Sequence, residues 1–196
     1  MEKREINMKE LEERVLKDGK VLPGGVLKVD SFLNHQIDPQ ILMAMANELK
    51  RLYDGYGINK VMTVEASGIA IAVFAAYVFN CRAVFAKKSK TSNISDDVYS
   101  AEVRSFTHGN TNTVVCSKEY LCKGDKVLIV DDFLAHGEAL RGLISICEQA
   151  GAEVVGCGIA IEKVFQGGGN ELREKGIRVE SLCKIASMSD TSLEIC

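Results

Sequence analysis

The segment that decides the fold is residues 127–139, Val127-Leu128-Ile129-Val130-Asp131-Asp132-Phe133-Leu134-Ala135-His136-Gly137-Glu138-Ala139. Its four apolar residues predict a buried strand, with two acids at the carboxyl end of that strand. A loop of small residues follows, and a helix is predicted from about Ala139 to Ala150, ending at Gly151. In an open α/β sheet, ligands bind beyond the carboxyl ends of the strands, so a site is expected here.

Strands and helices are predicted to alternate along the rest of the chain. Further strands are expected at residues 60–65, 83–86, 154–161 and 179–183, and helices at 8–16, 39–52 and 69–78. Residues 103–106 and 113–117 are expected to pair as a hairpin across 108–110. This order predicts one α/β domain over residues 1–196, with a mostly parallel sheet flanked by helices.

The composition, 46% hydrophobic and 26% charged residues, is that of a globular protein. A net charge of -3 and the lack of a long basic run argue against nucleic-acid binding. The charged segment 1–20 does not have the pattern of a signal peptide, and the apolar run 69–79 is too short to span a membrane. Seven cysteines without a C-x-x-C pair predict free thiols, and we expect a cytoplasmic protein.

The chemistry of residues 127–139 suits a phosphorylated sugar. Backbone N–H groups of a tight loop at a helix N-terminus bind phosphate well. The carboxylates of Asp131 and Asp132 can accept hydrogen bonds from vicinal hydroxyls, and phosphate together with a diol describes a ribose 5-phosphate. Taken alone, the two acids are as compatible with a solvated turn that holds a helix-capping acid as with a ligand site.

Other nucleotide motifs are missing from this sequence. Neither G-x-G-x-x-G nor G-x-x-x-x-G-K-[ST] occurs, and Gly167-Gly168-Gly169 has neither spacing, so we expect it to form a mobile loop. The polar stretch from Lys87 to Ala101 shows no period, and a long structureless loop in a compact domain is more often functional than idle.

The whole string 127–139 resembles the phosphoribosyl pyrophosphate (PRPP) signature of the type I phosphoribosyltransferases: four apolar residues, two acids, a spacer and a small-residue loop. Further segments between about Val26 and Leu182 resemble the bacterial xanthine phosphoribosyltransferase branch of that family. These segments are 27–39, 65–69, 105–107, 161–166 and 178–182.

The resemblance implies a type I phosphoribosyltransferase fold with a small N-terminal hood and a flexible lid loop. It implies transfer of ribose 5-phosphate from PRPP to xanthine, giving XMP and pyrophosphate in purine salvage, with Mg²⁺ carried by the pyrophosphate rather than bound directly by the protein. The alternatives are a hypoxanthine/guanine phosphoribosyltransferase and a non-catalytic PRPP-sensing regulator. Because relatives are dimers, a homodimer is expected, with Met43-Ala44-Met45 as an apolar contact region.

The resemblance also assigns roles toward PRPP. Asp131 and Asp132 are implied to bind the ribose hydroxyls and to face the positive charge that develops on the sugar. The residues implied to hold the phosphates are Ala135, His136, Gly137, Glu138 and Ala139 at the 5-phosphate, Ala66 and Ser67 at the pyrophosphate, and Lys87 and Lys88 beside the lid. For the two lysines, a solvated charge run is an equally good reading.

On the base side, the resemblance places Lys163 against the 6-oxo group of the purine, where an ammonium favours an oxo group over an amino group. Phe165 is either a stacking partner of the base or a core residue. Leu27 and Asn34 match base-contacting positions, although Asn34 ahead of Pro39 is also suited to an Asx-turn.

Two features depart from the commoner family pattern. The phosphate loop lacks hydroxyl residues, so phosphate binding must depend on its backbone N–H groups, with a cation from His136 as an option. Hypoxanthine-guanine relatives have an acid in this loop that acts as a base toward the purine, whereas this chain has Leu134 and Ala135 there. The group that accepts the purine proton is therefore not assigned.

Overall fold

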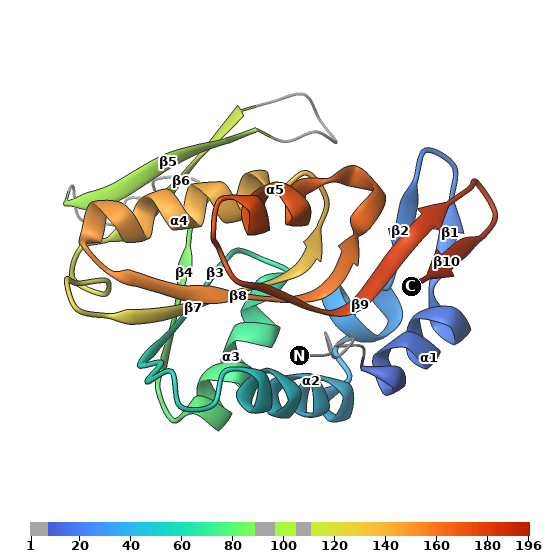
Figure 1. The fold of residues 1–196 in the computed structure, drawn as a ribbon, viewed down its shortest axis with the longest axis horizontal. Helices are drawn as coiled ribbons and strands as arrows, with labels where there is room; N and C mark the ends of the chain where they lie inside the picture. Colours follow the sequence, from blue (N-terminus) through green and yellow to red (C-terminus); the bar gives the residue numbers. More distant parts are fainter. Residues whose placement is uncertain (1–7, 89–96, 105–110) are drawn as a thin grey trace.

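The computed structural model describes residues 8–88, 97–104 and 111–196. A six-stranded sheet in the order β10-β9-β8-β7-β3-β4 forms the centre, and only the edge pair β10 and β9 is antiparallel (Figure 1). From one edge to the other, the strands are β10 (Leu193–Ile195), β9 (Val179–Met188), β8 (Glu153–Lys163), β7 (Lys126–Leu134), β3 (Lys60–Val64) and β4 (Arg82–Ala86).

Helices cover both faces of this sheet (Figure 1). The helices α2 (Pro39–Leu52) and α3 (Gly68–Phe79) pack on one face, where their apolar side chains share a core with Leu128 and Val130. The helices α4 (Glu138–Ala150) and α5 (Gly168–Glu174) pack on the other face, against Ile129 and Ile159. The buried strands are apolar on both sides, as a parallel sheet between two helical layers requires.

The chain before α2 forms a small unit beside β9 and β10. It contains α1 (Lys9–Asp18), the hairpin β1 (Lys20–Leu22) and β2 (Val26–Lys28), and a π-helical turn, η1 (Asp30–Asn34). Figure 1 shows the hairpin next to β10, and the Gly24 N–H donates to Asp190 Oδ1 between the two turns at 3.2 Å. We call the β1–β2 hairpin the hood.

A second hairpin, β5 (Val98–Arg104) with β6 (Thr111–Ser117), lies over α4 (Figure 1). The bridge between Lys87 and Val115 joins it to the end of β4. The predicted hairpin is confirmed, but its first arm begins at Val98, so the expectation of a structureless segment up to Ala101 was wrong for its last residues. Residues 89–96 of the polar stretch from Lys87 to Ala101, which is expected to form the lid, lie outside the described residues. So do residues 105–110, which hold the end of a predicted strand and the predicted turn.

The central strand β7 is longer than its apolar run. It continues through both acids to Leu134, because β8 extends equally far and pairs with it up to Glu162. The acids therefore belong to the strand itself, and the backbone of Asp131 pairs with Ile159 in the parallel ladder instead of forming a turn.

One other expectation was wrong. Gly167-Gly168-Gly169 is not a loop, because Gly168 begins α5 and both Gly168 and Gly169 are buried against neighbouring backbone and side-chain atoms. In the expected dimer contact 43–45, Met45 is fully buried in the core, whereas Met43 and Ala44 are half-buried. Exposed apolar residues at this edge of the sheet include Val73 and Tyr77 of α3 and Phe85 of β4.

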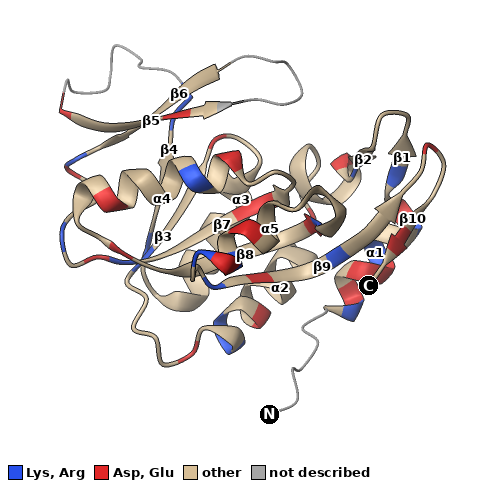
Figure 2. Cartoon of the chain, turned by 45° about the horizontal axis from the view of Figure 1, so that its top comes forward, with Lys and Arg blue, Asp and Glu red and all other residues tan. Residues whose placement is uncertain are grey.

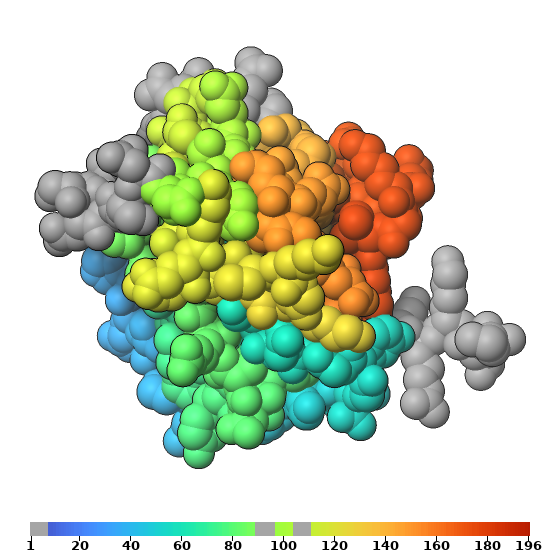
Figure 3. Space-filling model, turned by 90° about the vertical axis from the view of Figure 1, so that its left-hand side faces the viewer, coloured from blue at the N-terminus to red at the C-terminus, as the bar shows by residue number. Residues whose placement is uncertain are grey.

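The amino-terminal ends of the parallel strands carry charge pairs instead of a site. The ammonium of Lys60 lies 2.8 Å from Asp125, and that of Lys126 lies 3.6 Å from Glu153. Figure 3 shows this end, where the connection between β6 and β7 (yellow) crosses the molecule. Basic and acidic residues are interspersed over the described chain (Figure 2). Within the described residues, no helix is both long and apolar enough to cross a membrane.

Candidate active site

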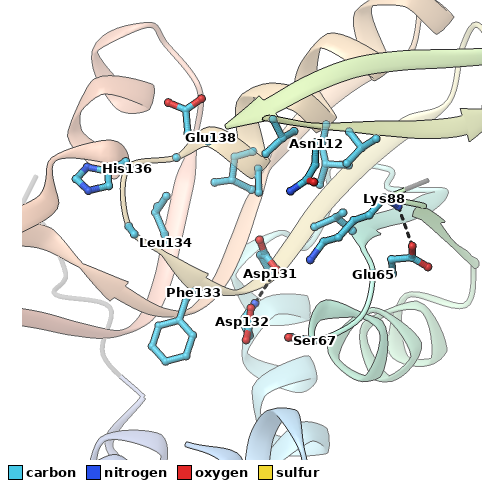
Figure 4. A pocket seen from close by; sticks show the side chains of 18 residues that line it. Glu65, Ser67, Lys88, Asn112, Asp131, Asp132, Phe133, Leu134, His136 and Glu138 are labelled. Carbon is cyan, nitrogen blue, oxygen red and sulfur yellow. Dashed lines mark hydrogen bonds between the residues drawn. The ribbon is translucent and has the colours of Figure 1, made fainter. Parts of the chain in front are cut away.

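The two acids of β7 form a linked pair at the carboxyl end of the sheet. Asp131 is buried, Asp132 is half-buried, and the Asp132 N–H donates to Asp131 Oδ1 at 3.0 Å (Figure 4). The side-chain amide of Asn34, at the end of η1, donates to Asp132 Oδ2 at 3.0 Å. This contact fixes one carboxylate from the N-terminal part of the chain, 98 residues away in sequence.

The environment of Asp131 disfavours its ionised form. Burial is the main cause that raises its pKa well above 3.8, and the negative charge of Asp132 raises it further. The backbone N–H of Asp132 and the ammonium of Lys88 act in the opposite direction. A strained pair of carboxylates of this kind is typical of functional sites, because a positively charged ligand or transition state relieves it.

A cavity of about 280 Å³ opens beside these acids. The loop from Ala135 to Gly137 forms one wall and leads into α4, and Gly137 at the helix N-cap has φ of +82°, a conformation that favours glycine. Figure 4 shows the loop on one side of the acids and Lys88 on the other. The polar residues that line the cavity are Glu65, Ser67, Lys88, Asn112, Asp131, Asp132, His136 and Glu138.

The turn from β3 into α3 forms the opposite wall. A Cβ on Gly68 would lie 1.9 Å from Thr63 Oγ1 and 3.2 Å from Asp131 Oδ1, so only glycine brings α3 this close to the acid. The Glu65–Ala66 peptide bond in this turn is cis. The Lys88 N–H donates to Glu65 Oε1 at 2.7 Å, and this contact joins the end of β4 to the turn (Figure 4).

The predicted PRPP-binding residues are largely brought together here. The two acids, Ser67, Lys88 and residues 135–139 all line the cavity. Ala66 and Lys87 do not line it: Ala66 is exposed beside Ser67, and the backbone of Lys87 pairs with Val115. The cavity thus combines a helix N-terminus, a cation and two carboxylates.

The four predicted base-binding residues lie outside the lining of this cavity, toward the hood. Asn34 contacts Asp132, and the Lys163 ammonium donates to the carbonyl of Gly25 in the hood at 2.7 Å. Leu27 is buried in the core, and Phe165 is 45% exposed. Asn34 therefore lies at the acid pair and Lys163 at the hood, whereas the exposed Phe165 is not a core residue.

Sequence reasoning gave no role to the lining residues Phe133 and Asn112, and it named Glu65 only as part of the resembling segment 65–69. Phe133 lies between the two sides of the site, with its ring 5.6 Å from the Lys163 ammonium, and its place inside the motif was the available signal. Asn112 enters the cavity from β6, and Glu65 anchors Lys88. No sequence signal identified Asn112, because its position depends on how the β5–β6 hairpin folds over α4.

The fold and this cavity are those of an α/β protein with a helix N-terminus and an acid pair at the carboxyl end of a parallel sheet. The family model for the phosphoribosyl transferase domain matches residues 28–183, and the chain belongs to the phosphoribosyltransferase family. Curated relatives named xanthine phosphoribosyltransferase are 50% identical over 187 residues in Limosilactobacillus reuteri and 52% identical over 186 residues in Finegoldia magna. Each comparison covers 95% of this chain and 98% of the relative.

Solved structures show the same fold at lower identity. Adenine phosphoribosyltransferase from Giardia lamblia, complexed with 9-deazaadenine, has a TM-score of 0.75 at 22% identity, covering 89% of this chain and 97% of that chain. The Rhodothermus marinus adenine phosphoribosyltransferase has a TM-score of 0.73 at 21% identity, with 90% and 99% coverage. These comparisons confirm the predicted type I phosphoribosyltransferase architecture.

The raised pKa of Asp131 predicts that this carboxylate destabilises the free protein. Asp131→Asn keeps an oxygen that accepts from the Asp132 N–H but removes the buried charge. We expect the variant to be more stable at pH 7, with a melting temperature about 2 to 4 °C higher for each kcal/mol gained, and to be inactive. Thermal unfolding and a turnover assay measure the two effects.

The sign of the pH dependence follows from the raised pKa. Below pH 3.8 the wild-type group is protonated in both folded and unfolded chains, so the advantage of Asp131→Asn should vanish. It should grow as the pH rises from there to the folded-state pKa of Asp131. An Asp131→Asn variant that is less stable than wild type at pH 7 would show that the ionised carboxylate is favoured.

Proposed function

We propose that this chain transfers the 5-phosphoribosyl group of PRPP to xanthine, giving XMP and pyrophosphate. The observation that carries the substrate assignment is the 50–52% identity, over nearly the whole chain, to relatives named xanthine phosphoribosyltransferase. That observation does not favour the hypoxanthine/guanine enzyme or the regulator. We further propose that residues 1–196 act as a single phosphoribosyltransferase domain.

In the proposed reaction the bond from the anomeric carbon to pyrophosphate breaks, and a bond from that carbon to a purine ring nitrogen forms, with loss of the nitrogen-bound proton. Positive charge develops on the sugar in between. Asp131 and Asp132 accept hydrogen bonds from the ribose hydroxyls and place negative charge next to the developing positive charge. The unfavourable ionisation of Asp131 in the free protein is then relieved most strongly in the transition state.

Phosphate binding divides between the two walls of the cavity. The loop of Ala135, His136, Gly137, Glu138 and Ala139 binds the 5-phosphate through backbone N–H groups and the N-terminus of α4. The pyrophosphate binds at the turn of Ala66 and Ser67, with Lys88 supplying positive charge; Lys87 lies next to it. The Lys88 side chain points toward the acids in Figure 4, which suits a cation placed between ribose and pyrophosphate.

The base binds between the acids and the hood. Lys163 uses one of its three N–H donors on Gly25, so two remain for the 6-oxo group of the purine. Burial lowers the pKa of the Lys163 ammonium, and a polarised oxo group would favour its charged form. Asn34, Leu27 and Phe165 complete the base site in this proposal, with Asn34 also orienting Asp132.

We propose that Mg²⁺ enters the site bound to the pyrophosphate group of the substrate. Among the described residues, no group of three or more His, Cys, Asp or Glu side chains could hold a metal ion. Magnesium usually keeps several waters and binds through substrate phosphates, which fits an ion carried by the pyrophosphate group of PRPP. When bound, it supplies charge neutralisation on the leaving pyrophosphate.

We also propose a cytoplasmic homodimer. All seven cysteines are free thiols, five of them with a raised pKa because of burial, which suits a reducing compartment. For the dimer, exposed Val73 and Tyr77 lie one helical turn apart on α3, and Phe85 of the edge strand β4 lies on the same side of the sheet. This apolar face replaces residues 43–45 as the proposed contact.

The substrate proposal predicts a clear preference in a parallel assay. With PRPP and Mg²⁺, kcat/KM for xanthine should exceed that for hypoxanthine, guanine and adenine by about tenfold or more, roughly the value of one pocket hydrogen bond. A preference for another purine would contradict the assignment of the base site. Binding of PRPP without turnover of any base would support the regulator instead.

Lys163 gives a second test, of the base site itself. Lys163→Met should raise KM for xanthine about tenfold, since a hydrogen bond to a charged group contributes about 1.5–3 kcal/mol, and should leave PRPP affinity within about twofold. Asp190→Ala is the matched control, because it removes the other tether of the same hood turn. An equal rise in KM in both variants would mean that Lys163 acts through the hood and not on the base.

A further inference from the structure

The loop proposed to bind the 5-phosphate is held from behind at two consecutive carbonyls. The Gly168 N–H, at the start of α5, donates to the carbonyl of Ala135 at 3.1 Å. The Arg141 guanidinium, from the second turn of α4, donates through Nη2 to the carbonyl of His136 at 2.6 Å. Both contacts come from the side of the loop away from the cavity, because neither Arg141 nor Gly168 lines it.

These contacts set the direction of the loop's N–H groups. In a trans peptide the C=O and the N–H of one unit point in opposite directions. Since the carbonyls of Ala135 and His136 point back toward α5 and Arg141, the N–H groups of His136 and Gly137 point forward, into the cavity. A loop without hydroxyl side chains depends on these N–H groups for binding an anion.

Arg141 also pairs with Glu138, the acidic residue of the loop. Its Nη2 lies 2.6 Å from Glu138 Oε1, and its Nη1 lies 3.3 Å from Glu171 Oε2 of α5. Figure 4 shows the Glu138 carboxylate pointing away from Asp131 and Asp132. Arg141 thus neutralises a negative charge that would otherwise oppose a phosphate at this helix N-terminus.

The helix α5 can serve as a support because it is itself fixed. Glu162 of β8 is 1% exposed and accepts two hydrogen bonds from Arg173 of α5, at 2.9 and 2.6 Å, and one from Ser181 of β9 at 2.5 Å. Burial raises the pKa of Glu162, but the bonds from Arg173 and Ser181 outweigh it and lower the pKa below 4.5. A Cβ on Gly169 would lie 1.9 Å from Glu162 Oε1, so the helix sits directly on this charge pair.

The close approach at Gly168 leaves no space for a side chain. A Cβ there would lie 2.4 Å from the carbonyl carbon of His136, 2.5 Å from the Ala135 oxygen and 2.6 Å from the Gly137 nitrogen. All three atoms belong to the backbone of the phosphate loop, so any larger residue would push the loop toward the cavity.

We propose that Arg141 and Gly168 are positioning residues for the 5-phosphate of PRPP. They hold two loop carbonyls backward, so that the N–H groups face the phosphate, and Arg141 keeps Glu138 away from it. The proposal rests on the proposed function in that the phosphate belongs to PRPP. It predicts that substituting either residue weakens binding of the 5-phosphate end of PRPP and leaves binding of the pyrophosphate end unchanged.

Calorimetric titration with two fragments of PRPP measures binding at each end separately, with no purine present. Ribose 5-phosphate has the 5-phosphate only, and magnesium pyrophosphate has the leaving group only. Arg141→Gln should weaken ribose 5-phosphate binding about tenfold and change pyrophosphate binding less than about twofold. Arg141→Lys, which keeps a cationic donor, should recover a large part of the loss.

Arg178→Gln is the matched control. The Arg178 side chain is 30% exposed, as is that of Arg141, and it likewise donates to a carboxylate, Glu180 at 2.7 Å, and to a backbone carbonyl, Leu52 at 2.9 Å. It precedes β9, at the end of the sheet away from the cavity. Both fragments should bind to this variant within about twofold of wild type.

Gly168→Ala is the second variant, and it keeps every charged contact. It should also bind ribose 5-phosphate more weakly than wild type while binding magnesium pyrophosphate normally. If Arg141→Gln does not fold, this variant alone tests the proposal. Unchanged ribose 5-phosphate binding in the folded variants, or an equal loss for both fragments, would overturn the proposal. A wild type that binds both fragments but does not use xanthine would contradict the proposed base instead, and the fragment comparison would still decide the roles of Arg141 and Gly168.

Discussion

A buried carboxylate, Asp131, held beside a second one at the end of the central strand, is the constraint on which the site depends. Burial and the charge of Asp132 both raise its pKa, so the free protein maintains an unfavourable arrangement. The surrounding structure enforces that arrangement from three sides. The ladder with β8 fixes the backbone, Gly68 brings α3 close to the carboxylate oxygen, and Asn34 holds the neighbouring acid. A sugar that becomes positively charged in the transition state is the species that such a pair stabilises most.

The two proposed phosphate sites lie on opposite sides of this pair and differ in construction. One is a helix N-terminus where two loop carbonyls, those of Ala135 and His136, accept hydrogen bonds from Gly168 and Arg141, so that the N–H groups of the same two peptide units face the other way. The other is a strand-to-helix turn with a lysine joined to it through the backbone. The proposed base site lies where the hood meets β8, and Lys163 connects the two. The proposed substrate sites therefore involve the carboxyl ends of β3, β7 and β8 and the N-terminal unit.

Much of the fold was predictable, since the apolar runs of β3, β7, β8 and β9 and the glycine that ends α4 are strong local signals. That the acids, Ser67, Lys88 and residues 135–139 line one cavity agrees with the family resemblance, which specifies residue type and order in each of these segments. What was not predictable depended on tertiary contact. Three glycines follow one another around the start of α5, and the helix is held by tertiary contacts, in which Glu162 accepts from Arg173 and the loop 135–137 lies against Gly168. Asn112 and Phe133 were missed since their positions depend on the hairpin over α4 and on the length of β7.

The central claim is that Asp131 is held in an environment that opposes its ionisation. A carbon-13 NMR titration of the side-chain carboxyl of Asp131 in the free protein measures this directly, with Asp132→Asn to assign the signal and remove the coupled charge. The account predicts that Asp131 titrates well above 3.8, and that its pKa falls in the Asp132→Asn variant because the neighbouring negative charge is gone. A pKa at or below 3.8 in the wild-type protein would contradict it, because the carboxylate would then be stabilised rather than strained by its surroundings.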